Sequence, residues 1–215
     1  MAKQSINIGS AANDGTGSTL RAAFDICNDN FTELYDGSGG LLHKIEGTNF
    51  TGSLLVGHST TGTISSATYN TALGIGALDA ITQGDYNVAV GYNAGTALTT
   101  GSHNVLLGGK AGDSITTGDQ NIAIGYEALQ YEDTDGRNIA IGHQALNSLR
   151  AGADGYNIAI GYDAGVAMST GVRNTLVGAT AGDALTTGSY NVAVGYDALS
   201  TEDGDGKIVA VGYQA

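Results

Sequence analysis

Two short acidic turns are the segments of this sequence whose residue types could bind a metal ion. Both combine three carboxylates with glycine, and the six residues are Glu132, Asp133, Asp135, Glu202, Asp203 and Asp205. Clustered carboxylates beside a glycine turn suit hard cations such as Ca²⁺, but these segments are too short for an EF-hand loop. We interpret them as solvated acidic surface, predict no cofactor and no metal site, and keep Ca²⁺ as the alternative.

The histidines offer no catalytic pattern. His43, His58, His103 and His143 are far apart in the sequence, and no nucleophile and base, zinc-ligand spacing or phosphate loop can be built from them. Paired carboxylates could serve a glycan-cleaving protein, but their separation is set by the fold and not by the sequence. The sequence therefore predicts that the protein is not an enzyme.

Tyrosines recur at one position of a repeated block and could form an aromatic surface. The five are Tyr92, Tyr126, Tyr162, Tyr196 and Tyr213. Stacked phenol rings pack on one another and keep their hydroxyls in water. We predict a packing ladder here, with the binding of sugar rings from a host glycan as the alternative.

A 17-residue repeat must position all of these residues. Ten six-residue blocks, such as NVAVGY and NIAIGY, follow one another at spacings of 17 residues, with one spacing of 19 between Asn138 and Asn157. The fifth residue of every block is glycine, and eight blocks begin with asparagine. Residues 87–137 also match residues 157–207 at 28 of 51 positions, which indicates that four repeats were duplicated as a unit.

Each block predicts a β-strand with one bulky and one small face. In the block that starts at Asn87, Val88 and Val90 alternate with Ala89 and Gly91. Threonine-glycine corners then suggest a short second strand and turns that use the positive φ of glycine. Since 17 residues cannot bury an apolar face alone, the repeats must stack, with asparagine side chains forming a hydrogen-bonded ladder.

The predicted fold class is therefore an all-β repeat protein. Ten 17-residue rungs would form a parallel β-solenoid or β-roll over residues 53–215, roughly 48 Å long, preceded by a short amino-terminal strand and a helix. The small face formed by alanine and glycine would let another backbone approach closely, which predicts a symmetric oligomer, most simply a homotrimer.

The first 52 residues lack the repeat. Between residues 18 and 35, apolar residues follow a spacing of 4, 3, 4 and 3, which predicts a helix with a trimerisation seam of Leu20, Phe24, Cys27, Phe31 and Leu34. An amphipathic helix on a small globule is the alternative. We assign residues 1–40 to docking and trimerisation and residues 41–52 to a connector.

Composition and charge exclude several classes of protein. Glycine accounts for 35 of 215 residues without the collagen period and without any proline, and 41% of residues are apolar, so neither collagen nor plain disorder fits. A net charge of −13 disfavours nucleic acid and anionic membrane surfaces as partners. The sequence has no apolar run long enough to cross a membrane and no signal-peptide pattern at its start.

Two family resemblances join these observations. The segment from Ile6 to Gly37, INIGSAANDGTGSTLRAAFDICNDNFTELYDG, resembles the amino-terminal segment of tail fibres and other appendages of tailed bacteriophages. The NxAxG blocks resemble the head repeats of YadA-like trimeric adhesins and related repeats in phage fibres. These resemblances imply a homotrimeric fibre located in the virion and made in the host cytoplasm, which docks on tail or baseplate proteins through its amino end.

The sequence thus predicts a structural protein, a tail fibre shaft that projects toward the host surface and supports host attachment. A receptor-binding tailspike that binds or cleaves glycan is the alternative. Because the last block ends at Ala215 without a polar capping unit, we expect further polypeptide or another protein to cover the final rung. The host, its receptor, the virion protein used for docking, and the handedness and exact symmetry of the solenoid stay open.

Overall fold

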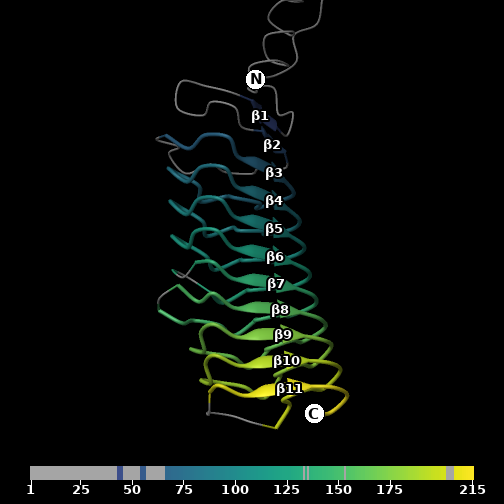
Figure 1. Ribbon diagram of the computed structural model, residues 1–215. Helices are drawn as coiled ribbons and strands as arrows, with labels where there is room; N and C mark the ends of the chain where they lie inside the picture. Colours follow the sequence, from purple (N-terminus) through teal and green to yellow (C-terminus); the bar gives the residue numbers. More distant parts are fainter. Residues whose placement is uncertain are drawn as a thin grey trace, which may run out of the picture.

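The repeats fold into a β-solenoid (Figure 1). The computed structural model describes residues 43–45, 54–56, 66–132, 134, 136–152, 154–201 and 206–215. These residues form strands and turns, with no helix among them. The predicted docking segment, residues 1–40 with its helix over 18–35, lies outside the described residues, as do Leu20, Phe24, Cys27, Phe31 and Leu34.

The described strands have three residues each and form one sheet in chain order. They are β1 (His43–Ile45), β2 (Leu54–Val56), β3 (Thr71–Leu73), β4 (Val88–Val90), β5 (Val105–Leu107), β6 (Ile122–Ile124), β7 (Ile139–Ile141), β8 (Ile158–Ile160), β9 (Thr175–Val177), β10 (Val192–Val194) and β11 (Val209–Val211). Each of the ten sequence blocks supplies one strand, from β2 to β11.

The strand register confirms the predicted stacking. From β2 to β11 every strand pairs in parallel with the next, so that Ala89 lies beside Leu106, and Ala123 beside Ala140. The longer rung between Asn138 and Asn157 keeps this register, because Ile139 pairs with Ile158. β1 pairs antiparallel with β2, a strand that the sequence analysis did not anticipate inside its connector.

In each rung the residues between the strand and the next block, which we call the return part, form turns. The predicted second strand is therefore wrong. Backbone hydrogen bonds still join these turns to neighbouring rungs. Thr99 N donates to Thr116 O (2.9 Å), and Lys110 N donates to Tyr92 O (2.8 Å). Because every rung satisfies its backbone groups through the rungs on either side, the turns are part of the stack and not loose loops.

Glycine is required where the strand ends. Gly125, the fifth residue of its block, has a φ of 137°, and a Cβ there would collide with the carbonyl oxygen of Gly142. The corner glycines differ from the prediction, since Gly101 does not have positive φ. Gly101 instead makes room for the carbonyl of Gly118, and the left-handed conformation falls on the residue before each block, such as Tyr86 (φ 57°).

The buried asparagines form the predicted ladder. Asn104 shows the pattern: its backbone N and its Nδ2 both donate to Oδ1 of Asn87 (2.9 and 3.0 Å), and Nδ2 also donates to Gly118 O (2.9 Å). Asn121 N in turn donates to Oδ1 of Asn104 (2.9 Å). The side chain therefore replaces, inside a narrow core, the partners that water would supply.

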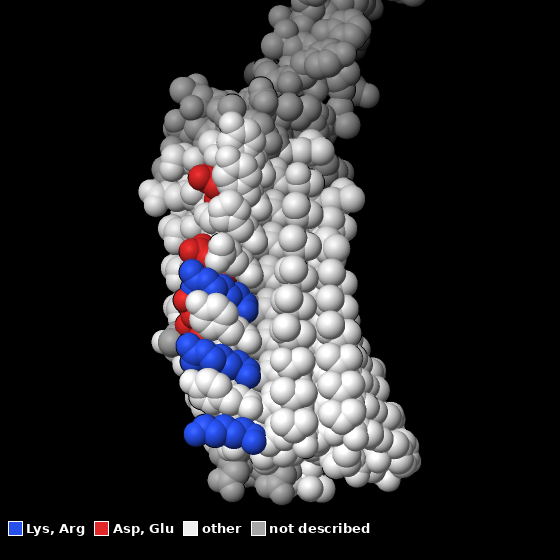
Figure 2. All heavy atoms as spheres, in the orientation of Figure 1, with Lys and Arg blue, Asp and Glu red and all other residues white. Residues whose placement is uncertain are grey.

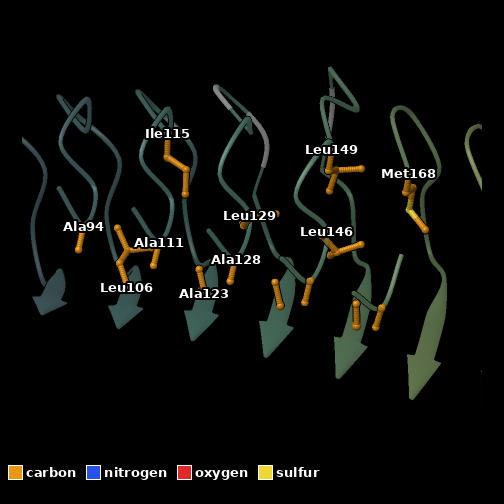
Figure 3. Close-up of a cluster of buried hydrophobic side chains, with 14 of the residues drawn as sticks. Ala94, Leu106, Ala111, Ile115, Ala123, Ala128, Leu129, Leu146, Leu149 and Met168 are labelled. Atoms are coloured by element: carbon orange, nitrogen blue, oxygen red, sulfur yellow. The ribbon is translucent and has the colours of Figure 1, made fainter. Parts of the chain in front are cut away.

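The core lies inside the coil and is lined by the small face of the strands (Figure 3). Ala89, Ala123 and Ala159 are completely buried, so the prediction that the alanine face contacts another chain is wrong. The reason is that larger apolar residues on the return part, such as Leu98 and Met168, fill the same interior. The coil is narrow, so the strand residue that faces these side chains is small unless glycine on a neighbouring segment makes room for a larger one.

Neighbouring rungs compensate for each other in side-chain size. Leu106 occupies a strand position that is alanine in most rungs, and its methyl groups occupy the space where Gly95 and Gly112 would carry a Cβ. Leu176 does the same beside Gly165 and Gly182. The core is therefore filled by pairing a large residue on one element with glycine on the next.

Candidate self-association surface

The outward side of the parallel sheet carries four columns of side chains, with one member of each column on each rung. Counting the asparagine of each block as position 1, the columns are formed by positions 17, 2, 4 and 6. Position 3 points into the core, while positions 2 and 4 face solvent, as the burial pattern of β4 to β7 shows. We call positions 2 and 4 the aliphatic band, position 6 the tyrosine column and position 17 the basic column.

The aliphatic band is apolar along the described shaft. Its members are Thr71, Leu73, Val88, Val90, Val105, Leu107, Ile122, Ile124, Ile139, Ile141, Ile158, Ile160, Thr175, Val177, Val192, Val194, Val209 and Val211. In the orientation of Figure 2 the columns to the right of the basic column contain no charged side chain, whereas Asp and Glu atoms appear on its left. Leu73 is 52% exposed and Ile160 is 38% exposed. Most other members are partly buried and two are threonines, so the band is a long, partly exposed and largely aliphatic face, which is typical of a contact surface.

The tyrosine column contains short stacks instead of one continuous ladder. Tyr126 and Tyr162 stack on the two faces of His143, with ring centroids 5.7 and 5.0 Å apart, and Tyr196 stacks on Tyr213 at 5.5 Å. Tyr92 is not in a stack, because the next rung has Gly109 at this position. All five predicted tyrosines are at least half exposed. The prediction of ring packing is thus correct for four of them.

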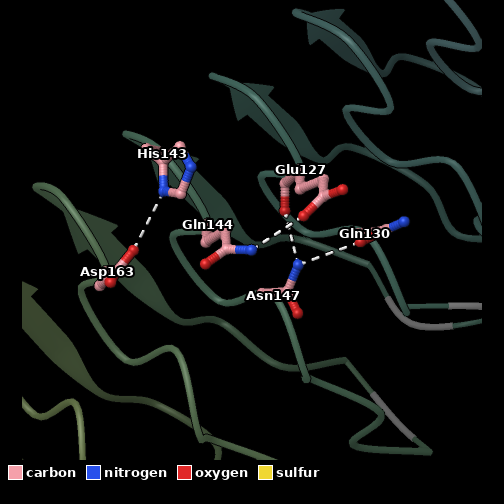
Figure 4. A network of polar contacts seen from close by, with 6 residues as sticks. All are labelled: Glu127, Gln130, His143, Gln144, Asn147 and Asp163. Atoms are coloured by element: carbon pink, nitrogen blue, oxygen red, sulfur yellow. Dashed lines mark hydrogen bonds and ion pairs between the residues drawn. The ribbon is translucent and has the colours of Figure 1, made fainter.

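Hydrogen bonds link polar side chains of neighbouring rungs beside the tyrosine column (Figure 4). Gln144 Nε2 donates to Glu127 Oε2 (2.8 Å), and this hydrogen bond is the main cause that lowers the pKa of Glu127. Lys110 Nζ lies 3.6 Å from Glu127 Oε1. A hydrogen bond with Glu127, followed by its negative charge, raises the pKa of Tyr126.

The basic column forms the opposite edge of the band. In the first rungs it contains stacked rings, with Tyr69 on Tyr86 (4.8 Å) and Tyr86 on His103 (5.1 Å). In the later rungs cations alternate with tyrosines, and Arg173 packs between Tyr156 and Tyr190 with 5.5 Å from its guanidinium carbon to each ring centroid. Figure 2 shows Lys and Arg gathered in this one line along the shaft.

The acidic turns do not form a site in the described part of the chain. Glu132 is completely buried, which corrects the prediction that it belongs to a solvated surface. It occupies the interior position that Ile115 and Leu149 hold in neighbouring rungs. The other five residues, Asp133, Asp135, Glu202, Asp203 and Asp205, lie outside the described residues. Among the described residues, no three His, Cys, Asp or Glu side chains are placed to hold a metal ion.

Sequence reasoning missed the aliphatic band and the basic column as surfaces. Alternation along a strand indicates that the two faces differ, but it does not say which face points outward. The signal that could have decided lies on the return part, where the eleventh residue after six of the eight block asparagines, such as Leu98 or Ile115, is large and apolar. A narrow coil that buries those residues leaves little room for another large side chain on the inner face, and Leu106 fits there beside Gly95 and Gly112.

Comparisons with family models, curated proteins and solved structures find no match to this chain. Within the described residues, no helix has the length and apolar character needed to cross a membrane. The outward face of the sheet is the part of the described chain whose side chains are free to contact a partner.

Proposed function

We propose that this chain is a structural protein, the shaft of a homotrimeric phage tail appendage, whose copies associate through the aliphatic band. The exposed row of aliphatic side chains over successive parallel strands supports this proposal most directly. Burying such a surface against an apolar partner releases ordered water and is favourable in proportion to the area covered.

The periodicity of the band favours a second copy as its partner. Its side chains recur at the strand spacing of about 4.8 Å, so a complementary surface must have the same period over its whole length. Another copy of this chain meets that condition automatically. Parallel copies held at one end would place like rungs side by side, and three copies around an axis would each turn the band inward.

The resemblance of residues 6–37 to the amino-terminal segments of phage appendages supports the placement in a virion. That segment would dock the shaft on tail or baseplate proteins, and the repeats would act as a rigid spacer toward the host surface. Rigidity is expected because every rung is joined to the next through backbone and asparagine hydrogen bonds.

Binding of host glycan by the shaft is the second candidate function. It is favoured by the exposed stack of Tyr126, His143 and Tyr162, whose outer ring edges lie beside the aliphatic band. A glycan array together with incubation on host capsule would test it. Strong binding to this column, or released oligosaccharide, would replace the spacer function.

The mass of the full chain in solution tests the association. Analytical ultracentrifugation should give three times the mass of one chain. Replacing Ile124 and Ile141 by glutamate, on adjacent strands of the band, should dissociate the trimer while the strand content in circular dichroism is retained. Replacing the exposed Gln120 by glutamate adds charge outside the band and should leave the trimer intact. A wild-type monomer, or a trimer that survives both isoleucine changes, would contradict the proposal.

A further inference from the structure

The later rungs of the basic column form a strip in which cations and rings alternate. Its five residues, one per rung, are Arg137, Tyr156, Arg173, Tyr190 and Lys207. The Arg137 guanidinium lies 5.6 Å from the ring centroid of Tyr156, and Arg173 Nη1 donates to the hydroxyl of Tyr190 (3.1 Å). Cation–π contacts and this hydrogen bond therefore hold the side chains in register along the shaft.

The strip is positive in a protein that is strongly negative. Only eight Lys and Arg occur in the chain, against 21 Asp and Glu, and three of the eight belong to this strip. The residues that precede the strip members carry no charge; they are Gly136, Gly155, Val172, Ser189 and Gly206. Arg137 also pairs with Asp154, whereas no carboxylate of the described residues pairs with Arg173.

The earlier rungs of the same column have the opposite character. Tyr86 and Gln120 are preceded by Asp85 and Asp119, and the column has no permanent cation there. The Asp85 carboxylate accepts hydrogen bonds from the backbone N and the hydroxyl of Thr68 (both 2.7 Å), so these acids support the turns. Positive charge is thus a property of the later strip, and not of position 17 as such.

The spacing of the strip matches a chain of sugar rings. Strands lie about 4.8 Å apart, so the cations on every second rung are about 9.6 Å apart. A pyranose ring in an extended 1→4- or 1→3-linked chain spans about one rung. A polymer with a carboxylate on every second ring would therefore place each charge near a cation and the intervening ring beside the hydroxyl edge of a tyrosine. Tyr156 and Tyr190 are about half exposed, and because arginine side chains pack on their ring faces, it is their hydroxyl edges that can hydrogen-bond to such a sugar.

We propose that Arg137, Tyr156, Arg173, Tyr190 and Lys207 bind a linear acidic polysaccharide that runs along the shaft and carries a carboxylate on alternate sugars. Guanidinium groups donate paired hydrogen bonds to carboxylates, and several weak contacts along one polymer add to each other. This binding function goes beyond the proposed structural role and does not depend on the trimer, because the strip is at the edge of the aliphatic band, where interfaces stay open to solvent.

Single-stranded nucleic acid is the other polymer that combines charge with flat rings. It carries a phosphate on every nucleotide, and its affinity depends on many cations along a groove. A strip with a cation on every second rung, on a protein of net charge −13, is a poor match to that charge density. The favoured ligand is thus the less densely charged polymer.

Isothermal titration calorimetry on the full chain can test this. The probe is a hyaluronan decasaccharide, whose carboxylates occur on alternate sugars, and the neutral comparison is a chitin oligosaccharide. We expect hyaluronan to bind at least about tenfold more tightly than chitin, with an affinity that falls as salt is added. Absence of binding at millimolar hyaluronan, or equal binding of chitin, would overturn the proposal. Tighter binding of an oligothymidylate of equal length would also overturn it and point to nucleic acid.

Charge variants locate the binding. The double change Arg137→Gln and Arg173→Gln should weaken hyaluronan binding by about tenfold or more. Glutamine is tolerated at this position, since Gln120 occupies it in the earlier rungs, and an unchanged melting temperature would check the fold. Lys110→Gln removes a cation beside the tyrosine column and should leave the affinity unchanged. An equal loss in Lys110→Gln, or no loss in the double variant, would contradict binding at the strip.

Discussion

The two copies of the duplicated four-rung unit can be compared over three rungs each, residues 87–137 and 157–207; they have kept most of their interior and changed one edge of their outward face. Inside, Asn104 corresponds to Asn174 and Leu106 to Leu176, with the same hydrogen bonds and packing. At the edge, His103 corresponds to Arg173 and Gln120 to Tyr190. Stacking therefore constrains the core residues of every rung, whereas residues of the basic column can change in charge and aromatic character without disturbing the stack.

Replacing the glycine at the end of a strand should lower the free energy of unfolding most, and by the same amount in both copies. Gly91→Ala and Gly161→Ala each place a Cβ against the carbonyl of the next rung at a φ of 135° or 145°. We expect each to cost about 3–5 kcal/mol of the free energy of unfolding, measured by chemical denaturation. Gly152→Ala is the control, because nothing lies within 4 Å of its Cβ, and it should cost about 1 kcal/mol. Similar losses in all three variants would contradict the stacking explanation.

Removing one ladder asparagine should have the next largest effect. In Asn174→Ala the backbone N of Asn191 loses its acceptor (2.9 Å) and Gly188 O loses its donor (2.9 Å) inside the core. Asn104→Ala has the same consequence in the first copy. Each should cost about 2–4 kcal/mol, because several buried polar groups are left without partners. A loss of unfolding free energy in only one copy would show that the ladder is not equivalent in the two units. A loss below about 1 kcal/mol in both would contradict a stabilising role of the ladder.

Exchanging core residues between the copies should change little. Leu98 corresponds to Met168, and both are completely buried. Met168→Leu and Leu98→Met conserve volume and should each change the unfolding free energy by no more than about 1 kcal/mol. A larger loss would mean that the two interiors have diverged after all, and the contact of Asn174 Nδ2 with Met168 Sδ (3.6 Å) would be the first place to look.

Replacing the equivalent carboxyls of Asp113 and Asp183 should have the smallest effect on stability, and this effect should depend on pH. Burial is the main cause that raises the pKa of both Asp113 and Asp183, and in each the Oδ1 is buried without a hydrogen-bond partner in the described structure. A raised pKa means that ionisation destabilises the folded state, so stability should be highest below the ordinary value of 3.8 and fall as pH rises through the folded value.

Neutral replacements test this sign. Asp113→Asn and Asp183→Asn should each stabilise the protein by about 0.5 kcal/mol at neutral pH, a small value because both side chains are partly exposed. Thermal denaturation at neutral and acidic pH would measure it, and the difference from wild type should disappear in acid. Destabilisation by both variants at neutral pH would contradict the assigned pKa direction.

Much of this fold could be predicted because the repeat itself carries the information. Identical blocks at a fixed spacing predict parallel strands in register, and Asn104 with Gly125 illustrates the ladder and the close approach that such stacking imposes. The outward face could not be predicted in the same way. Whether Val90 or Ala89 points inward depends on how much volume Leu98 already fills, which is a property of the closed coil.

The basic column shows a further limit of sequence reasoning. Arg173 and Tyr156 are 17 residues apart, and their contact exists only because the rungs stack with one residue over the next. Arg173 has a left-handed backbone (φ 58°) and an exposed side chain, while the side chain of the adjacent Asn174 is buried. The alternation of the two side chains is that of a strand, but a positive φ is unusual outside glycine, and propensity does not predict it.

Thiol labelling of the assembled chain tests most directly whether the aliphatic band is covered while its edge stays open. In a Cys27→Ser background, whose mass in analytical ultracentrifugation must equal that of the wild-type protein because Cys27 is in the predicted seam, Ile141→Cys places a thiol on the band and Arg173→Cys places one on the basic column. Both positions face solvent in a single chain, so the comparison reports on association. We predict that maleimide reacts readily at position 173 and at least about tenfold more slowly at position 141 in the native protein, with equal rates after denaturation. Equal rates at both positions in the native protein would contradict the proposed shaft.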